Sequence, residues 1–259
     1  MLLVDIHAHL DHPAFKENLN EVIIKAKDVG LKAVVLNGVN SASNRRILEL
    51  VKKDSILKAA LGFYPVELTK MTVNYSEEIS KEKIDIDQEL EFMRKNKEKF
   101  VAFGEVGLDY QETEDRKIQK EGFEKIISLA EKLKKPIIVH SRKAEEDAIN
   151  MLVSSNAKKV VMHCFHGRKN LVKLGMEHGF HFSIPVNIVR SHQFQMITEM
   201  ANLTQLFTET DAPYLGIERN KQNEPANVVY TIKKISEIKK MEQIEVSNII
   251  YQNWQRVFE

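Results

Sequence analysis

Short apolar runs alternate with longer segments of helical periodicity along the whole chain. Each run is nearly continuous and rich in β-branched residues, which is typical of parallel strands that are covered on both faces. Between the runs, apolar residues recur at helical spacing, and the segment 123–133 stops before Pro136, as a helix should. The eight runs are Leu2–Ala8, Lys32–Gly38, Leu57–Phe63, Phe100–Val106, Pro136–Ser141, Val160–Phe165, Phe180–Val186 and Leu206–Asp211.

Eight strand–helix units favour an α/β fold, a single (β/α)₈ TIM barrel, which typically needs about 250 residues. A doubly wound sheet is the competing arrangement, although it requires no particular number of strands. The connection from Tyr64 to about Asp85 lacks a Gly/Ser tract, so we interpret it as a lid-like loop within one domain, residues 1–259. Beyond the eighth run, Ala226–Lys239 and Glu245–Phe258 are predicted to form two closing helices, the second an extra C-terminal helix.

Composition narrows the class of protein. The 38 Lys and Arg residues nearly balance the 37 Asp and Glu residues, which excludes a uniformly basic nucleic-acid coat but leaves room for a local basic patch. One cysteine, Cys164, excludes a disulfide framework and a cysteine-built zinc site, and it fits a reducing compartment. No apolar stretch is long enough to span a membrane, and Asp5 interrupts any signal-peptide core. We therefore expect a cytoplasmic protein without membrane contact or an obligate protein partner.

Ionisable residues end several of the predicted strands, where a barrel enzyme places its catalytic groups. Their burial in apolar strands is costly unless they are paired or bind a metal. The period-2 spacing of His7 and His9 points both imidazoles to the same side of the first strand. The residues at these ends are Asp5, His7, His9, Glu105, His140, His163, Glu209 and Asp211.

Six of these side chains form the predicted metal site: His7, His9, Glu105, His140, His163 and Asp211. Imidazole and carboxylate ligands suit Zn²⁺, Mn²⁺ or Fe²⁺, and Mg²⁺ is possible where oxygen ligands dominate. Six ligands exceed the three of a mononuclear catalytic zinc, so we predict two divalent cations with Glu105 as the bridge. Asp211 could bind one cation and accept a proton from the attacking water, which implies hydrolysis.

The predicted strand–helix loops indicate what the substrate is. Basic residues on this rim could bind phosphates, and aromatic residues could stack on unpaired bases. Solvated charges and loop-anchoring aromatics are equally good interpretations of any one of them. The basic residues are Arg142, Lys143, Arg168, Lys169, Arg190, Arg219 and Lys221, and the aromatic residues are Phe63, Tyr64, Tyr110, Phe165 and Tyr214.

The remaining notable residues divide between the two ends of the predicted barrel. His166 falls in a strand–helix loop and is a candidate substrate contact, together with Arg142, Tyr64 and Arg219. His178 and His181 are expected at the opposite end, at a helix end and a strand start. Cys164 follows His163 directly, so strand alternation predicts that its thiol packs toward the helices and is not a nucleophile.

Several motifs in order resemble those of the TatD-type metal-dependent deoxyribonucleases, within the amidohydrolase-like barrel superfamily. The motifs are DIHAHLD at 5–11, GEVGLDY at 104–110, VHSR at 139–142, HCFHG at 163–167, ETDAPYL at 209–215 and NEP at 223–225. The resemblance implies a (β/α)₈ barrel that uses two divalent metals to hydrolyse nucleic-acid phosphodiesters, often as a 3′ exonuclease. It implies the same six ligands, and it adds Asn223 to the candidate substrate contacts.

Three positions depart from the family pattern. Tyr64 stands where many relatives have a histidine before proline, His166 replaces a small residue, and Gln222 replaces a common arginine. None is a predicted ligand, and the last two bear on substrate preference. Two alternatives to a DNA nuclease stay open at this point. One is a small-molecule amidohydrolase or esterase on the same dinuclear site, and the other is a metal-holding scaffold that binds nucleic acid without cutting it.

Overall fold

Eight parallel strands form a barrel in chain order, as predicted. The computed structural model describes residues 1–69, 85–111, 115–218 and 221–259. Each strand pairs with its sequence neighbours, and an isolated parallel bridge between Ala8 and Ala212 joins the last strand to the first. The strands are β1 (Leu3–Ala8), β2 (Leu31–Asn37), β3 (Leu57–Leu61), β4 (Ala102–Asp109), β5 (Ile137–Arg142), β6 (Val160–Met162), β7 (His181–Ile184) and β8 (Leu206–Thr208).

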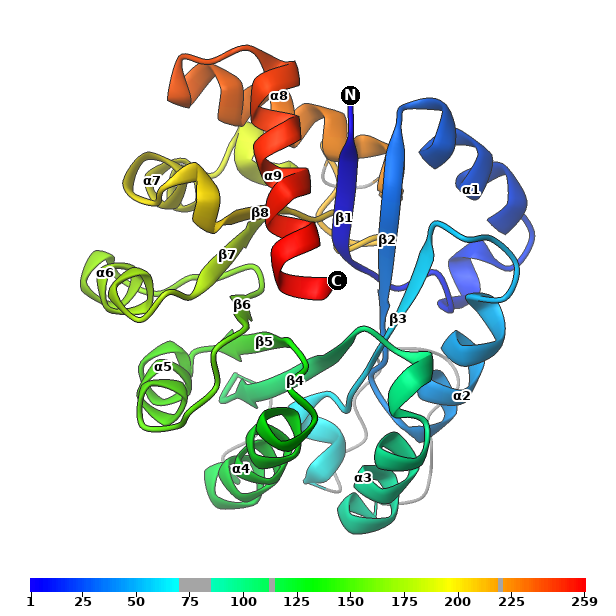
Figure 1. The fold of residues 1–259 in the computed structure, drawn as a ribbon, viewed down its shortest axis with the longest axis vertical. Helices are drawn as coiled ribbons and strands as arrows, with labels where there is room; N and C mark the ends of the chain where they lie inside the picture. Colours follow the sequence, from blue (N-terminus) through cyan, green and yellow to red (C-terminus); the bar gives the residue numbers. More distant parts are fainter. Residues whose placement is uncertain (70–84, 112–114, 219–220) are drawn as a thin grey trace.

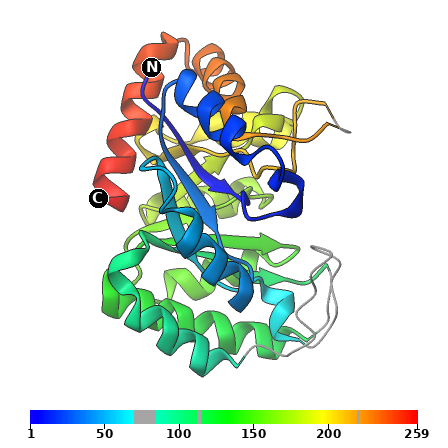
Figure 2. The same cartoon turned by 90° about the vertical axis from the view of Figure 1, so that its right-hand side faces the viewer.

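Helices surround the barrel (Figure 1). They are α1 (Leu19–Asp28), α2 (Ser41–Leu50), α3 (Ile86–Lys95), α4 (Arg116–Leu133), α5 (Glu145–Val153), α6 (Lys169–Glu177), α7 (His192–Met200), α8 (Val228–Lys239) and α9 (Gln243–Phe258). Short 3₁₀ helices, η1 to η6, occupy Pro13–Phe15, Pro65–Leu68, Lys97–Lys99, Val186–Val189, Leu203–Gln205 and Pro225–Asn227. Figure 2 shows α9 at one end of the barrel and the C-terminal ends of the strands at the other.

Several strands are shorter than the apolar runs that predict them, and β6 and β8 are two of these. The sixth run extends to Phe165 and the eighth to Asp211, but β6 ends at Met162 and β8 ends at Thr208. The backbone leaves the extended conformation there, because Cys164 has φ of 42° and Asp211 has φ of 56°. The side chains that follow these strands are therefore placed by turns and not by strand alternation. The proposed lid-like loop lies mostly outside the described residues, which resume at 85.

Side chains close the seam between β8 and β1, where the backbone pairing is sparse. The buried Asp5 carboxylate accepts hydrogen bonds from the backbone N–H and the hydroxyl of Thr210. The Thr208 hydroxyl donates to the carbonyl of Val4 across the same seam. Burial raises the pKa of Asp5 to about 8, although these hydrogen bonds oppose the shift. Asp5, which the sequence places among the strand-end ionisable residues, thus holds β8 against β1.

The two predicted closing helices are present as α8 and α9, and α9 packs against the barrel through a polar contact as well as an apolar face. Its Trp254 and Phe258 are buried and stack with ring centroids 4.6 Å apart. The buried Asn253 amide donates to the carbonyls of Leu203 and Leu206, at 2.9 and 2.8 Å. One side chain therefore satisfies two backbone acceptors at the start of β8.

We expect Asn253→Ala to lower the free energy of unfolding by about 2 kcal/mol, because the buried carbonyl of Leu206 and the partly buried carbonyl of Leu203 both lose the amide donor. Urea denaturation measures the change. The exposed Asn202, whose side chain caps no helix, supplies the control variant Asn202→Ala, which should change stability by less than about 0.5 kcal/mol. Equal effects of the two variants would contradict the role given to Asn253.

A second prediction concerns His181, which is buried at the start of β7 and has no hydrogen-bond partner at Nδ1. Burial, followed by the charge of Arg256, lowers its pKa to about 4. The unfolded chain binds this proton near pH 6.5, so the free energy of unfolding should fall as pH drops from 6.5 to 4, by up to about 3 kcal/mol.

Chemical denaturation across this pH range should show a shallower pH dependence for His181→Gln than for the wild-type protein. His178 is exposed at the end of α6, and His178→Gln should keep the wild-type slope. If His181→Gln and the wild-type protein follow the same curve, His181 does not titrate as described.

Candidate metal centre

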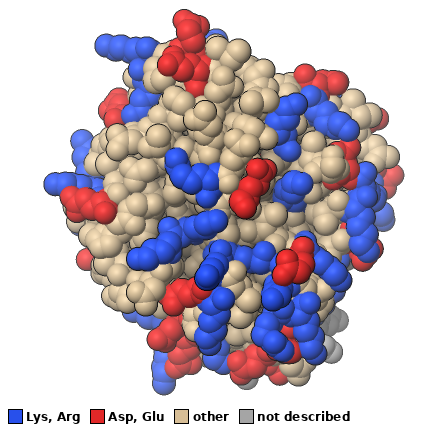
Figure 3. Space-filling view, viewed as in Figure 1, with Lys and Arg blue, Asp and Glu red and all other residues tan. Residues whose placement is uncertain are grey.

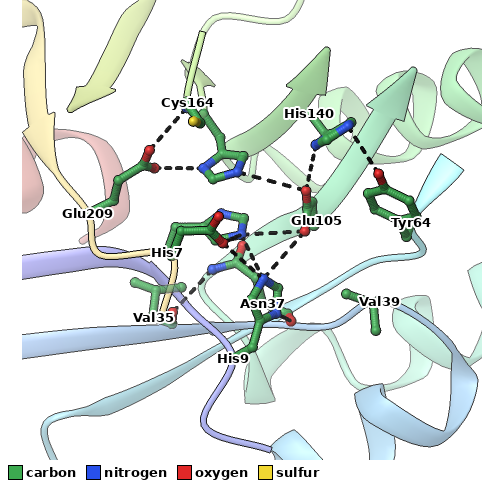
Figure 4. Close-up of polar contacts among 12 residues, drawn as sticks. His7, His9, Val35, Asn37, Val39, Tyr64, Glu105, His140, Cys164 and Glu209 are labelled. Carbon is green, nitrogen blue, oxygen red and sulfur yellow. Dashed lines mark hydrogen bonds and ion pairs between the residues drawn. The ribbon is translucent and has the colours of Figure 1, made fainter. Parts of the chain in front are cut away.

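The six predicted metal ligands meet at the C-terminal end of the barrel, around Glu105. This carboxylate is 1% exposed. Its Oε2 lies 3.4 Å from His7 Nε2 and 3.6 Å from His9 Nε2. Its Oε1 lies 2.8 Å from His140 Nδ1 and 3.9 Å from His163 Nε2. Figure 4 shows Glu105 between His140 on one side and the His7 and His9 pair on the other.

Asp211 completes the group on the β8 side. Its Oδ1 lies 3.4 Å from His9 Nε2 and 3.6 Å from His7 Nε2. The positive φ of Asp211 turns the chain, and its backbone N–H donates to the carbonyl of His7 at 2.8 Å. Ligand atoms of His7, His9 and Asp211 lie within 4.8 Å of one another, as do those of His7, Glu105 and His163. The two groups share His7, and the imidazole and carboxylate atoms of either group are of the kind that binds a divalent cation.

A glycine permits the close approach of β4 and β5 beside the site. Gly107 has φ of 141°, and a Cβ there would lie 2.0 Å from the carbonyl oxygen of His140. The register between the two strands also shifts between Phe103 and Val106, where Glu105 is located. An ordinary residue at 107 would force the strands apart and move His140 away from Glu105.

Carboxylates hold the outer nitrogens of two of the histidines. Asp109 Oδ2 lies 3.0 Å from His140 Nε2, and Glu209 Oε2 lies 2.7 Å from His163 Nδ1. Metal-binding histidines commonly donate their second ring N–H to such a partner, which fixes the ring and its tautomer. This arrangement directs Nδ1 of His140 and Nε2 of His163 toward Glu105.

His9 is held in the same way by the backbone. Its Nδ1 lies 3.0 Å from the carbonyl oxygen of Asn37, and the Asn37 amide in turn donates to the carbonyls of Ile6 and Val35. Asn37 and Asp109 are not among the site residues predicted from the sequence. The signal available in the sequence was their position, because both are polar residues that end apolar strands.

The buried carboxylates and histidines of the site shift one another's pKa values. Burial opposes ionisation of Glu105, but hydrogen bonds with His140 and His7 outweigh it and lower its pKa well below the usual range. Burial likewise opposes the charged form of His9 and His140, yet their carboxylate neighbours raise the pKa of each to about 9. Burial and the neighbouring His163 lower the pKa of His7.

The residues present fit a bound cation. Glu105 Oε2 is buried and has only the long contacts to His7 Nε2 and His9 Nε2, at 3.4 and 3.6 Å, with no well-formed hydrogen bond among the described residues. His7 Nε2 and His9 Nε2 face each other at 3.2 Å, so at least one lone pair points into the site. Buried carboxylate and imidazole groups that converge in this way are compensated when they bind a divalent metal ion.

Two of the predicted substrate contacts lie inside the protein. Tyr64 is 2% exposed, and its hydroxyl donates to Asp109. Asn223 is fully buried, donates to the carbonyl of Thr210 at 2.8 Å and accepts from the Asn227 amide. Both side chains are therefore used within the fold, since their polar atoms already have partners, and the structure does not bring them to the open end of the site. Arg219 lies outside the described residues.

The other two candidate contacts are exposed near the ligands. Arg142 ends β5, two residues after His140. His166 Nδ1–H donates to the carbonyl of Cys164 at 2.8 Å, and the His166 ring packs edge-on against Phe194. Cys164 is half-buried against the core, and its backbone N–H donates to Glu209.

Basic residues are not confined to the end of the barrel that carries the ligands. Figure 3, which views the molecule from the α9 end as Figure 1 does, shows Lys and Arg side chains spread over that face too. Basic side chains are therefore found on the α9 face as well as in the loops from which the basic rim is predicted. Of the helices in the described ranges, none is long and apolar enough to cross a membrane.

The chain is similar to known proteins along nearly its whole length. A model of the family described as TatD related DNase matches residues 4–259. A human protein named deoxyribonuclease TATDN3 is 33% identical over 262 residues, which cover 99% of this chain and 94% of the relative. An uncharacterized metal-dependent hydrolase of Bacillus subtilis, YabD, is 32% identical over 266 residues, which cover 99% of each chain.

A solved structure of YjjV, a TatD homolog from Escherichia coli, has the same fold. Its TM-score is 0.86 at 22% identity, and the match covers 99% of this chain and 97% of that one. This likeness confirms the barrel, while the family match and the sequence identities above 30% establish the relationship. The chain therefore belongs to the TatD related DNase family.

Proposed function

We propose that this protein is a divalent-metal-dependent hydrolase that cleaves phosphodiester bonds of DNA, with residues 1–259 acting as one hydrolase domain. The observation that carries the proposal is the buried Glu105 carboxylate, which has histidine nitrogens facing both of its oxygens. The names of relatives support DNA as the substrate, since the human relative is named a deoxyribonuclease.

The proposed ligand set divides around Glu105. His7, His9 and Asp211 would hold one divalent cation, His140 and His163 would hold the other, and Glu105 would lie between the two sets. Zn²⁺, Mg²⁺ and Mn²⁺ are the candidate ions. Cations bound there would activate water at neutral pH and neutralise charge on the phosphate oxygens.

The protein's own groups orient the substrate and move the proton. Hydrogen bonding to His9 outweighs burial and lowers the pKa of Asp211, so this carboxylate is ionised at neutral pH and can accept the proton of the attacking water. Asp211 is 8% exposed, so solvent reaches it. The exposed Arg142 and His166 stand near the ligands and are the proposed contacts to the phosphate backbone.

Asp211→Asn should lower kcat for DNA cleavage by about 10²–10⁴-fold, because the amide cannot accept the proton. Initial rates at saturating metal measure this effect, and circular dichroism checks the fold. The control variant is Asp87→Asn, since Asp87 is an exposed acid on α3, and it should cleave at the wild-type rate. A wild-type rate for Asp211→Asn would remove Asp211 from the chemistry.

The experiment that tests the function uses single-stranded and duplex DNA, each incubated with Mg²⁺, Mn²⁺ or Zn²⁺. We expect cleavage that stops when EDTA removes the metal and that His7→Ala/His9→Ala abolishes without unfolding the protein. Parallel assays offer a small ester and a small amide. Turnover of those compounds without cleavage of DNA under any metal would replace the nuclease with a small-molecule hydrolase.

A further inference from the structure

Tyr64 occupies an unusual position for a residue expected to touch substrate. It lies three residues after the end of β3 and immediately before η2, yet its side chain is buried. Its hydroxyl donates to the Asp109 carboxylate and lies 3.4 Å from His140 Nε2. Figure 4 shows the Tyr64 hydroxyl facing one ring nitrogen of His140, while Glu105 faces the other.

Asp109 is held rigidly on all sides. Its Oδ1 accepts from the backbone N–H of Gln111 at 2.8 Å, while its Oδ2 faces both His140 Nε2 and the Tyr64 hydroxyl. The side chain of the buried Gln119, on α4, makes two hydrogen bonds to the backbone of Asp109. It accepts from the Asp109 N–H and donates to the Asp109 carbonyl, each at 2.7 Å. The carboxylate therefore has little freedom to rotate away from His140.

Both ring nitrogens of His140 face carboxylates, Nε2 that of Asp109 at 3.0 Å and Nδ1 that of Glu105 at 2.8 Å. A carboxylate only accepts hydrogen bonds, so without a cation both nitrogens carry protons. A cation bound at Nδ1 would replace the proton there, while Asp109 would keep the proton on Nε2. The Tyr64 hydroxyl can only donate to Asp109 in this arrangement, and it thereby keeps Oδ2 in line with the imidazole.

A parallel arrangement supports the neighbouring ligand. The Ser183 hydroxyl of β7 donates to Glu209 Oε2, which is the oxygen that faces His163 Nδ1. Each of the two histidines proposed to hold the second cation thus contacts a carboxylate, and that carboxylate accepts a hydrogen bond from a hydroxyl. His9 relies on a backbone carbonyl instead, and His7 Nδ1 has no partner among the described residues.

We propose that Tyr64 is a positioning residue for the ligand His140, acting through Asp109, and that it does not contact substrate. The inference rests on the proposed function in taking His140 as a metal ligand. It predicts that the cation on the His140 and His163 side depends on the Tyr64 hydroxyl, while the cation on the His7, His9 and Asp211 side does not.

The test titrates metal-free wild type and Tyr64→Phe with Zn²⁺ by isothermal titration calorimetry in a competing chelator. Phenylalanine keeps the ring and removes only the hydroxyl. We expect one of two Zn²⁺ sites to weaken by about 10-fold, the low end of the 10–100-fold range for outer partners of metal ligands, and the other to stay unchanged. At saturating Zn²⁺, KM for DNA should equal the wild-type value.

The matched control is Tyr230→Phe, because Tyr230 is exposed on α8 and remote from the ligands. It should bind two Zn²⁺ ions as the wild type does. Unchanged Zn²⁺ affinity in Tyr64→Phe, with or without a raised KM for DNA, would overturn the proposal. Equal weakening of both sites with a lower melting temperature would also overturn it, since that result describes a packing residue.

A second variant keeps the proposal testable if Tyr64→Phe does not fold. In Asp109→Asn the side chain keeps the shape of the carboxylate but is a weaker hydrogen-bond acceptor. This variant should weaken binding of Zn²⁺ at the same site only. Wild-type affinity at that site would contradict the proposal. The calorimetry needs no DNA, so the proposed function can fail separately. A wild type that binds Zn²⁺ but cleaves no DNA would reject the nuclease and leave the Tyr64 comparison valid.

Discussion

A buried carboxylate surrounded by imidazoles is the constraint on which the ligand-bearing end of this barrel depends. Glu105 is nearly inaccessible to solvent, and a charge in that position is costly unless partners compensate it. The compensation comes from His7 on β1, His140 on β5 and His163 just after β6. These groups are far apart in sequence, so the strand register that packs the core also determines whether the charge is paired.

All eight strands contribute to the site, although only some provide ligands. Strands β1, β4, β5, β6 and β8 carry or precede the proposed ligands. The other three supply supporting groups, namely the Asn37 carbonyl from β2, Tyr64 following β3 and Ser183 from β7. The division explains why every strand carries or precedes a polar residue near its C-terminal end and why several of these residues are buried. Geometry at a metal centre is set as much by these outer partners as by the ligands.

The sequence was sufficient to predict the barrel and the convergence of six ligands, because apolar periodicity and strand-end position depend on local pattern. It was not sufficient for what depends on packing between elements. The strand ends at Met162 and Thr208 are set by the positive φ of Cys164 and Asp211, which no periodicity indicates. Tyr64 and Asn223 were expected at the open end, but partners from other segments, Asp109 and Thr210, hold them inside.

The most direct test of the account is anomalous X-ray diffraction from crystals of the wild-type protein soaked in Mn²⁺ or Zn²⁺. The account predicts one anomalous peak on each side of the Glu105 carboxylate, with His140 Nδ1 and His163 Nε2 facing one peak and His7, His9 and Asp211 facing the other. Anomalous peaks elsewhere on the molecule, with none beside Glu105, would contradict it.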